Sequence, residues 1–337
     1  MIRSIVAAAA AVLVAASVSG ATEQPPAPLS IALPSASVPK RLAPLGPAAP
    51  PWARRLYRRS VQVLIALTDR DGALVAGERD GWDHVWPRDA AAGAMALQAS
   101  GLQPEARRVV SFLGRLDLDD AARFHPDGSR VPGRPAAGDG AGWVGTAERT
   151  VSGTVRIGGG LATTDPHGSG DWRDRQDYGE NVTGDLLGNA IASGAPAAEI
   201  EARFLTPRGL VREKGTDDLD SAAAWAVTAF PSRGLRGPVR TTLLRLTRES
   251  KLFGIPPIQG WTPGEVWTAP TAWSAWALVE LGERRAADRL LAELHRAETP
   301  NGTLPERVDA TTGQPTSTTP LAWSHAFAIL ALRARYP

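Results

Sequence analysis

The sequence predicts an all-α fold built from antiparallel helix pairs. Apolar residues recur at helical spacing in roughly eleven stretches of the 337-residue chain. Within most pairs one connection is a tight turn, whereas the next is a long loop that carries Trp, Asp, Glu or Arg. Helices that each bury one apolar stripe must pack together, which would gather the long loops at one end. A straight helical solenoid is the alternative arrangement.

Two segments precede the first predicted helix. Residues 1–21 combine a basic start, an apolar run and small residues, a pattern typical of a secretory signal peptide. Residues 22–50 are rich in Pro, Ala and Ser without periodicity, and we interpret them as a linker. We therefore expect a secreted or periplasmic protein, free of the membrane after cleavage, whose folded domain covers residues 51–337.

Helices and loops alternate along the rest of the chain. The first helix is expected to begin at Pro51, and residues 132–170, rich in Gly and Pro, are expected to form a loop with a short strand pair at Thr150–Ile157. The other helices are expected at Ala90–Ser100, Pro104–Leu116, Asn181–Ile191, Ala197–Phe204, Ser221–Phe230, Gly237–Leu252, Thr268–Gly282, Glu283–Ala297 and Leu321–Arg335.

Composition narrows the possible partners. The chain has no cysteine, so burial rather than disulfide bonds must stabilise it. Its net charge is +2 without a basic stripe, which gives no indication of nucleic-acid binding. The five His show no metal-ligand spacing. Asp217, Asp218 and Asp220 lack the closing Glu of a calcium loop, so we interpret them as a helix cap and expect neither a metal nor a cofactor.

Residues 77–89 concentrate the chemistry of a binding site, with two Trp, two Arg, one His and four carboxylates. Exposed indole and unpaired buried charge are both unfavourable, so neither a plain loop nor a plain core segment fits. A sugar fits better, because Trp82 or Trp86 could stack on its ring while Arg88 and Asp89 bind adjacent hydroxyls. The alternative is an ion pair at the start of a helix, with both Trp side chains in the core.

This segment resembles the Trp-x-Arg-Asp motif of the glucoamylases, the family 15 glycoside hydrolases. Leu304–Asp309 and Pro320–Ala326 strengthen the resemblance, because they are similar to that family's Leu-Pro-Glu-x-x-Asp loop and Pro-Leu-x-Trp-Ser-His helix. The resemblance covers residues 51–337, with strong motifs only at the two ends. It implies an (α/α)6 barrel, a toroid of paired helices with which the helix count agrees. It also implies hydrolysis of terminal α-glucosidic bonds in oligosaccharides or polysaccharides, with inversion.

An inverting glycosidase needs one carboxyl group as general acid and another as general base. Considered alone, Glu306 would be an ordinary surface residue, but the resemblance implies that it is the base. The acid depends on the alignment. One register makes Glu180 the acid, whereas the other puts Arg173 in its place and leaves Asp174 or nothing. We prefer Glu180, although a following helix would lower its pKa and an acid needs it raised.

Further candidates follow from the same resemblance. Glu265 is a third possible acid, and Trp143 and Trp267 are expected to line the sugar site beside Trp82 and Trp86. Trp273 and Trp276, three residues apart on a predicted helix, are expected in the core. The alternative function is a non-catalytic carbohydrate-binding or cell-wall protein on the same barrel that has lost its acid. A helical scaffold that binds no sugar is a third possibility.

Overall fold

The computed structural model describes residues 37, 39–79, 81–119, 121–133, 136–153, 186–261 and 264–337. The chain divides into two compact units, residues 1–32 and 33–337, and all the described residues belong to the second unit. The expected signal peptide and the candidate acids Glu180 and Asp174 therefore lie outside the described residues.

Helices dominate the described chain. They are α1 (Pro51–Ala66), α2 (Pro87–Ala99), α3 (Gln103–Leu113), α4 (Gly140–Ser152), α5 (Leu187–Ala192), α6 (Ala197–Phe204), the 3-10 helix η2 (Ser221–Val227), α7 (Arg236–Arg248), α8 (Thr268–Glu280), α9 (Arg284–Arg296) and α10 (Ala322–Arg335). Two short antiparallel strand pairs accompany them, β1 (Leu205–Thr206) with β2 (Gly209–Leu210) and β3 (Glu265–Trp267) with β4 (Arg307–Asp309). The prediction of an all-α fold is confirmed. None of the helices described here has both the length and the apolar character needed to span a membrane.

Burial separates the helices into two sets. α2, α5, η2, α8 and α10 are buried on almost every side, and α4 on most sides. By contrast, α1, α3, α6, α7 and α9 each bury a single stripe, such as Ala287, Leu290, Leu291 and Leu294 on α9. A helix that is apolar on all sides must be surrounded by protein, whereas an amphipathic helix covers it from outside. The first set is thus an inner layer and the second an outer layer.

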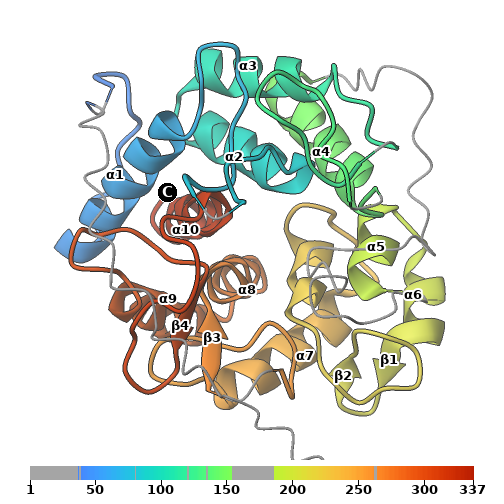
Figure 1. Ribbon diagram of the computed structural model, residues 1–337. Helices are drawn as coiled ribbons and strands as arrows, with labels where there is room; N and C mark the ends of the chain where they lie inside the picture. Colours follow the sequence, from blue (N-terminus) through green and yellow to red (C-terminus); the bar gives the residue numbers. More distant parts are fainter. Residues whose placement is uncertain are drawn as a thin grey trace, which may run out of the picture. The chain divides into compact units, whose positions relative to one another are not determined.

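The inner helices close into a ring. α2 contacts α4 and α10, α10 contacts α8, α8 contacts η2, η2 contacts α5, and α5 contacts α4. Figure 1 shows the outer helices α1, α3, α6, α7 and α9 around this ring. The closed ring is the toroid that the resemblance implied, and it excludes the straight solenoid.

Aromatic side chains fill the interior of the ring. Trp143 of α4, Trp225 of η2, Trp273 of α8 and Phe327 of α10 meet edge to face in a closed circuit. Their ring centroids are 5.0 Å apart from Trp143 to Trp225, 5.6 Å to Trp273, 5.3 Å on to Phe327 and 5.8 Å back to Trp143. All four side chains are fully buried, so this part of the barrel is a packed core.

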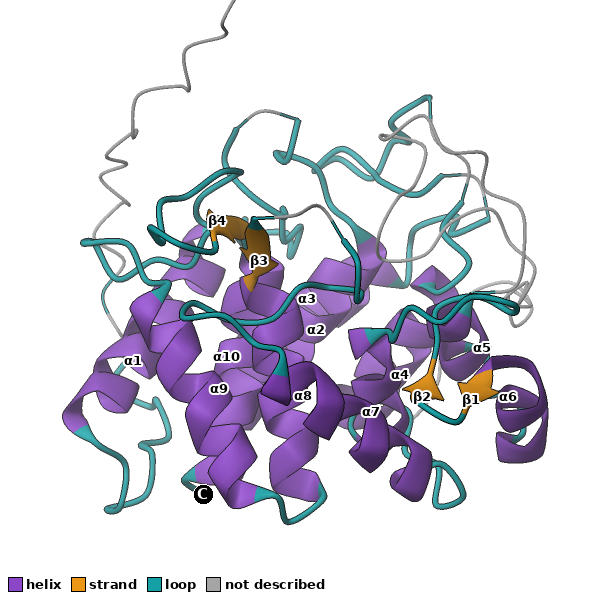
Figure 2. Cartoon of the chain, turned by 90° about the horizontal axis from the view of Figure 1, so that it is seen from below, coloured by secondary structure: helices purple, strands orange, loops and turns teal. Residues whose placement is uncertain are grey.

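One end of the ring carries the long loops. In Figure 2 the strands β3 and β4 and most of the long loops drawn in teal lie on one side of the helical layer, and the C-terminus lies on the other. We call the first side the loop face. Its position agrees with the expectation that the polar, Trp-rich loops gather at one end.

Three local expectations were wrong. α4 occupies part of the expected loop at residues 132–170, and it includes the start of the expected strand pair at Thr150. The glycines that argued against a helix allow close packing instead, since a Cβ at Gly142 would lie 2.2 Å from the carbonyl oxygen of Ala192. The α-helix expected at Ser221–Phe230 is the 3-10 helix η2, which ends at Val227. After Val227 the chain turns, and the amide of Phe230 donates to the carbonyl oxygen of Trp225.

The third difference concerns the linker expected up to residue 50. Leu45 and Ala49 are buried in the hydrophobic core. Tyr57 of α1 donates a hydrogen bond to the carbonyl oxygen of Ala43 at 2.8 Å. Residues 39–50 therefore belong to the folded unit. They form an irregular segment with two turns, and its backbone bonds to Ser100 and Tyr336, an arrangement that leaves no periodicity in the sequence.

Candidate active site

The two sequence motifs that carry the resemblance meet at the loop face. The amide of Ala322, at the start of α10, donates to the carbonyl oxygen of Ala76 at 2.8 Å. The guanidinium carbon of Arg88, at the start of α2, lies 4.8 Å from the centroid of the Trp323 ring. α2 and α10 are neighbours in the ring (Figure 1), so their first turns bring residues from both ends of the chain together.

The loop between α9 and α10, which carries Glu306, contacts the start of α8. The amide of Thr268, at the start of α8, donates to the carbonyl oxygen of Glu306 at 3.1 Å. The Thr268 hydroxyl lies 2.6 Å from that of Ser324 on α10, next to Trp323. The structure thus places Arg88 and Glu306, far apart in the sequence, around adjoining helix N-termini on one face of the ring.

Glu306 is buried and is held through one of its two carboxylate oxygens. Oε2 accepts a hydrogen bond from the Ser317 hydroxyl and lies 3.4 Å from Nε of Arg307. No residue in the described ranges bonds to Oε1. Burial raises the pKa of Glu306, whereas Arg307 and Ser317 oppose that rise. A carboxylate fixed by one oxygen can present the other to water, as a general base must.

Arg307 contacts both Glu306 and the strand β3. Its Nη1 donates to Oε2 of Glu265 at 3.0 Å, and its guanidinium carbon lies 5.6 Å from the centroid of Trp267. The β3–β4 register places Trp267 directly opposite Arg307. Trp261 packs edge to face on Trp267 with centroids 5.6 Å apart. Glu265, a candidate acid from the sequence, is therefore an ion-pair partner of Arg307.

Arg88 has a partner that the sequence did not reveal. Its Nη1 lies 3.0 Å from both carboxylate oxygens of Asp139, the residue before α4, and its Nε lies 3.8 Å from Asp89. All three side chains are almost fully buried. Asp139 lies 51 residues after Arg88, at the start of another helix, so the spacing of the sequence gives no sign of this contact. Arg88 therefore takes part in a buried ion pair at the start of a helix, as the alternative interpretation expected.

The aromatic candidates differ in burial, since Trp82 is partly exposed whereas Trp86, Trp267 and Trp143 belong to the hydrophobic core. Trp82 and Trp86 lie with their centroids 6.0 Å apart, and Arg123 lies over Trp86 at 5.7 Å. Trp267 lies beside Arg307, the ion-pair partner of Glu306. Trp143, however, is fully buried in the aromatic circuit of the core, so its expected role as a wall of the sugar site is wrong.

His325 of α10 supports the loop that carries Glu306. Its Nε2 accepts a hydrogen bond from the amide of Leu304 at 3.0 Å, so Nδ1 carries the proton, and it faces the Ser60 hydroxyl of α1 at 2.9 Å. Burial lowers the pKa of His325 from 6.5 to about 3. The folded protein therefore keeps this imidazole neutral, and protonation would remove the acceptor that holds Leu304.

We predict that this histidine makes the protein sensitive to acid. The unfolded chain takes up a proton near pH 6.5 whereas the folded chain does not, so stability falls as the pH falls from 6.5 towards 3. The slope contributed by one such proton is about 1.4 kcal/mol per pH unit. Urea unfolding at several pH values checks it. The variant His325→Gln keeps an acceptor without titrating, so its slope should be smaller by one proton; an equal slope in both proteins contradicts the prediction.

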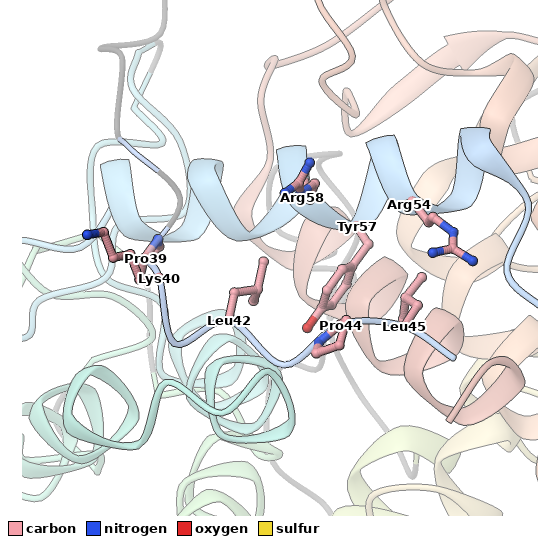
Figure 3. Close-up of a pocket in the computed structure, with 8 residues that line it drawn as sticks. All are labelled: Pro39, Lys40, Leu42, Pro44, Leu45, Arg54, Tyr57 and Arg58. Atoms are coloured by element: carbon pink, nitrogen blue, oxygen red, sulfur yellow. The ribbon is translucent and has the colours of Figure 1, made fainter. Parts of the chain in front are cut away.

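A groove lies away from Arg88 and Glu306, and none of the candidate site residues lines it. It has a volume of about 400 Å³ and lies between α1 and the segment before it, with Leu42, Leu45 and Tyr57 among its walls (Figure 3). Within the described ranges, no group of three or more His, Asp or Glu could hold a metal ion.

Comparison with known proteins gives structural matches alone. No protein-family model and no curated protein matches the sequence. A solved glycosidase is similar with a TM-score of 0.71 and 19% identity, covering 85% of this chain and 98% of that one. A glycosidase in complex with glucose gives a TM-score of 0.70 at 18% identity, with coverage of 85% and 98%. A bacterial glucoamylase complexed with acarbose gives 0.62 at 16%, with coverage of 83% and 55%.

These matches establish the fold. The chain has the helical toroid of the glucoamylases. At identities below one fifth, these matches show the fold alone.

Proposed function

We propose that this protein is a glycoside hydrolase that cleaves terminal α-glucosidic bonds of oligosaccharides or polysaccharides with inversion. The observation that supports the proposal is that Arg88 contacts Trp323 at the start of α10, while Glu306 contacts Thr268 at the start of the neighbouring inner helix α8. Proteins with similar folds are glycosidases and glucoamylases, one of them bound to glucose and another to acarbose. A glucose-containing substrate is therefore the ligand class that we propose here.

The residues of the loop face supply the groups that a sugar needs. Arg88 and Asp89 would bind hydroxyls of the terminal sugar, with Asp139 fixing the guanidinium through its two oxygens. Trp82, Trp86 and Trp267 would provide apolar surface for the faces of the rings. Each of these side chains is at least half-buried, so little conformational entropy would be lost when a sugar binds.

The reaction would proceed in one displacement at the anomeric carbon. Glu306 accepts a proton from a water molecule, and the water oxygen forms the new bond to that carbon. The bond to the leaving oxygen breaks as Glu180 donates its proton to that oxygen. In inverting glycosidases the two carboxyl groups lie about 6.5–9.5 Å apart, which leaves room for the water. Each product gains one hydroxyl group, and the configuration of the released sugar is opposite to that of the bond.

A direct test is product release from maltose, isomaltose, trehalose and dextran, followed by proton NMR. The glucose released from the chain end of dextran should appear first as the β-anomer, since one displacement inverts the anomeric centre that is attacked. Initial release of the α-anomer from the dextran chain end would contradict inversion. Binding without turnover on all of these sugars would instead favour the non-catalytic carbohydrate-binding alternative.

The acid can be tested separately from the base. Glu180→Gln should lower kcat on maltose by about 10²–10⁴-fold, the usual contribution of a general acid. It should have a much smaller effect on α-glucosyl fluoride, because fluoride leaves without protonation. Asp174→Asn, the candidate from the other register, is the matched variant and should retain activity. The assignment is wrong if Asp174→Asn shows the leaving-group dependence and Glu180→Gln does not.

We also propose that the protein is exported, on the basis of residues 1–21. N-terminal sequencing of the protein recovered outside the cytoplasm should begin near residue 22. Recovery only of cytoplasmic protein that begins at residue 1 would contradict export.

A further inference from the structure

Arg307 occupies an unusual position between two carboxylates. On one side its Nε lies 3.4 Å from Oε2 of Glu306, and on the other its Nη1 lies 3.0 Å from Oε2 of Glu265. The plane of the Trp267 ring lies nearby, with its centroid 5.6 Å from the guanidinium carbon. The β3–β4 pairing holds both strands in register. Arg307 is therefore constrained by an ion pair, an aromatic ring and the backbone.

The hydroxyl groups that bond to Glu306 and to its neighbour Pro305 are uncharged. Ser317 donates its hydroxyl to Oε2 of Glu306. From α8, the Thr268 hydroxyl donates to the carbonyl oxygen of Pro305 at 2.5 Å, and from α10 the Ser324 hydroxyl lies 3.4 Å from the same oxygen. Arg307 and Glu265 are the charged side chains that act on Glu306 among the described residues.

We propose that Arg307 is a positioning residue, held by Glu265 and Trp267 so that its guanidinium stays against the carboxylate of Glu306. This inference rests on the proposed role of Glu306 as the base. A base accepts a proton only in its ionised form, and burial disfavours that form. A fixed guanidinium within 4 Å stabilises the carboxylate and so keeps the base ready at a lower pH.

The role of Glu265 has two parts that act in opposite directions. Its ion pair holds Arg307 in place, but its negative charge raises the pKa of Glu306. The amide in Glu265→Gln would still accept the hydrogen bond from Arg307 while removing the charge. The proposal therefore assigns opposite effects to the two neighbours: loss of the charge of Arg307 raises the pKa of Glu306, and loss of the charge of Glu265 lowers it.

The test is a titration of the Glu306 carboxyl by carbon-13 NMR, with its signal assigned by its loss in Glu306→Gln. In Arg307→Gln the midpoint should rise by about 1–3 pH units, the usual effect of removing an adjacent opposite charge. Arg307→Lys should restore most of the midpoint, and Glu265→Gln should lower it. A stabilising role without electrostatic coupling would reduce the unfolding temperature and leave the midpoint unchanged, and that result would overturn the proposal.

The chain offers a matched control on α9. Glu293 is also buried, accepts from the Ser250 hydroxyl at 2.9 Å and pairs with Arg289 at 2.9 Å. Arg289→Gln should therefore leave the Glu306 midpoint unchanged. If the midpoint moves in this control as far as in Arg307→Gln, the effect is general and the proposal fails.

The titration needs no substrate, so it separates this inference from the proposed function. If sugars are hydrolysed, the acidic limb of the kcat/KM profile should shift in the same direction as the NMR midpoint in each variant. If no sugar is hydrolysed, the proposed function fails and the NMR midpoints alone decide whether Arg307 controls Glu306. An acidic limb that stays constant while the midpoint moves would show that Glu306 is not the base.

Discussion

Replacement of Glu306 by glutamine is expected to lower kcat by about 10²–10⁴-fold on every substrate, the usual contribution of a general base. The amide can still accept the Ser317 hydrogen bond but cannot take a proton from water. Because the base acts on the attacking water, the loss should be as large for α-glucosyl fluoride as for maltose. Steady-state kinetics on both substrates measure it. KM should change much less, since the side chain keeps its shape.

The matched control for this prediction is Glu293→Gln. Glu293 shares with Glu306 a buried carboxyl, a serine donor and an arginine partner, and burial raises its pKa as well. It lies on α9 in the outer layer, so its replacement should leave kcat unchanged. Similar losses in both variants would mean that the effect comes from the fold, and an unchanged kcat in Glu306→Gln would exclude it as the base.

Replacement of Arg88 by methionine is expected to destabilise the protein by about 3–5 kcal/mol, the usual cost of removing one partner of a buried ion pair. Asp139 is fully buried, and the variant removes both contacts at 3.0 Å from the guanidinium. Methionine keeps much of the packing against Trp323. Urea unfolding at neutral pH measures the loss, and adding Asp139→Asn to the same variant should recover part of it because the buried charge is gone.

Arg335 provides the comparison on the surface. It makes two contacts with Asp288, at 2.6 and 3.0 Å, but 43% of the Asp288 side chain is exposed. Water compensates exposed charges, so Arg335→Met should cost less than about 1 kcal/mol. Equal losses for the two variants would show that burial of Asp139 does not determine the stability contributed by Arg88.

Much of the fold could be predicted from local patterns. The starts of α8, α9 and α10 fall within one residue of the expected positions, because each follows a break in helical periodicity. α4 was missed because glycine lowers helix propensity, and the compensating contact of Gly142 with Ala192 is not local. Tertiary packing overrides the low helix propensity of glycine here, and a local stretch of sequence does not reveal that packing.

The sequence predicted those parts of the candidate site that lie in local motifs, but not the contacts between distant helices. Arg88 and Glu306 lie in compact motifs, and the structure brings their loops together at one face. Trp143 also lies in a polar, glycine-rich segment, but the direction of its ring depends on Trp225 and Phe327, which arrive from other helices. The pairing of Arg88 with Asp139 likewise depends on the closure of the ring.

The most direct measurement is a crystal structure of the Glu306→Gln variant with an α-linked glucose oligosaccharide bound. The terminal sugar is predicted to lie on the loop face, with its hydroxyls bonded to Arg88 and Asp89 and its anomeric carbon separated from position 306 by one water molecule. A sugar bound at the opposite end of the ring, or one whose anomeric carbon lies beyond the reach of such a water, would contradict the proposed hydrolysis.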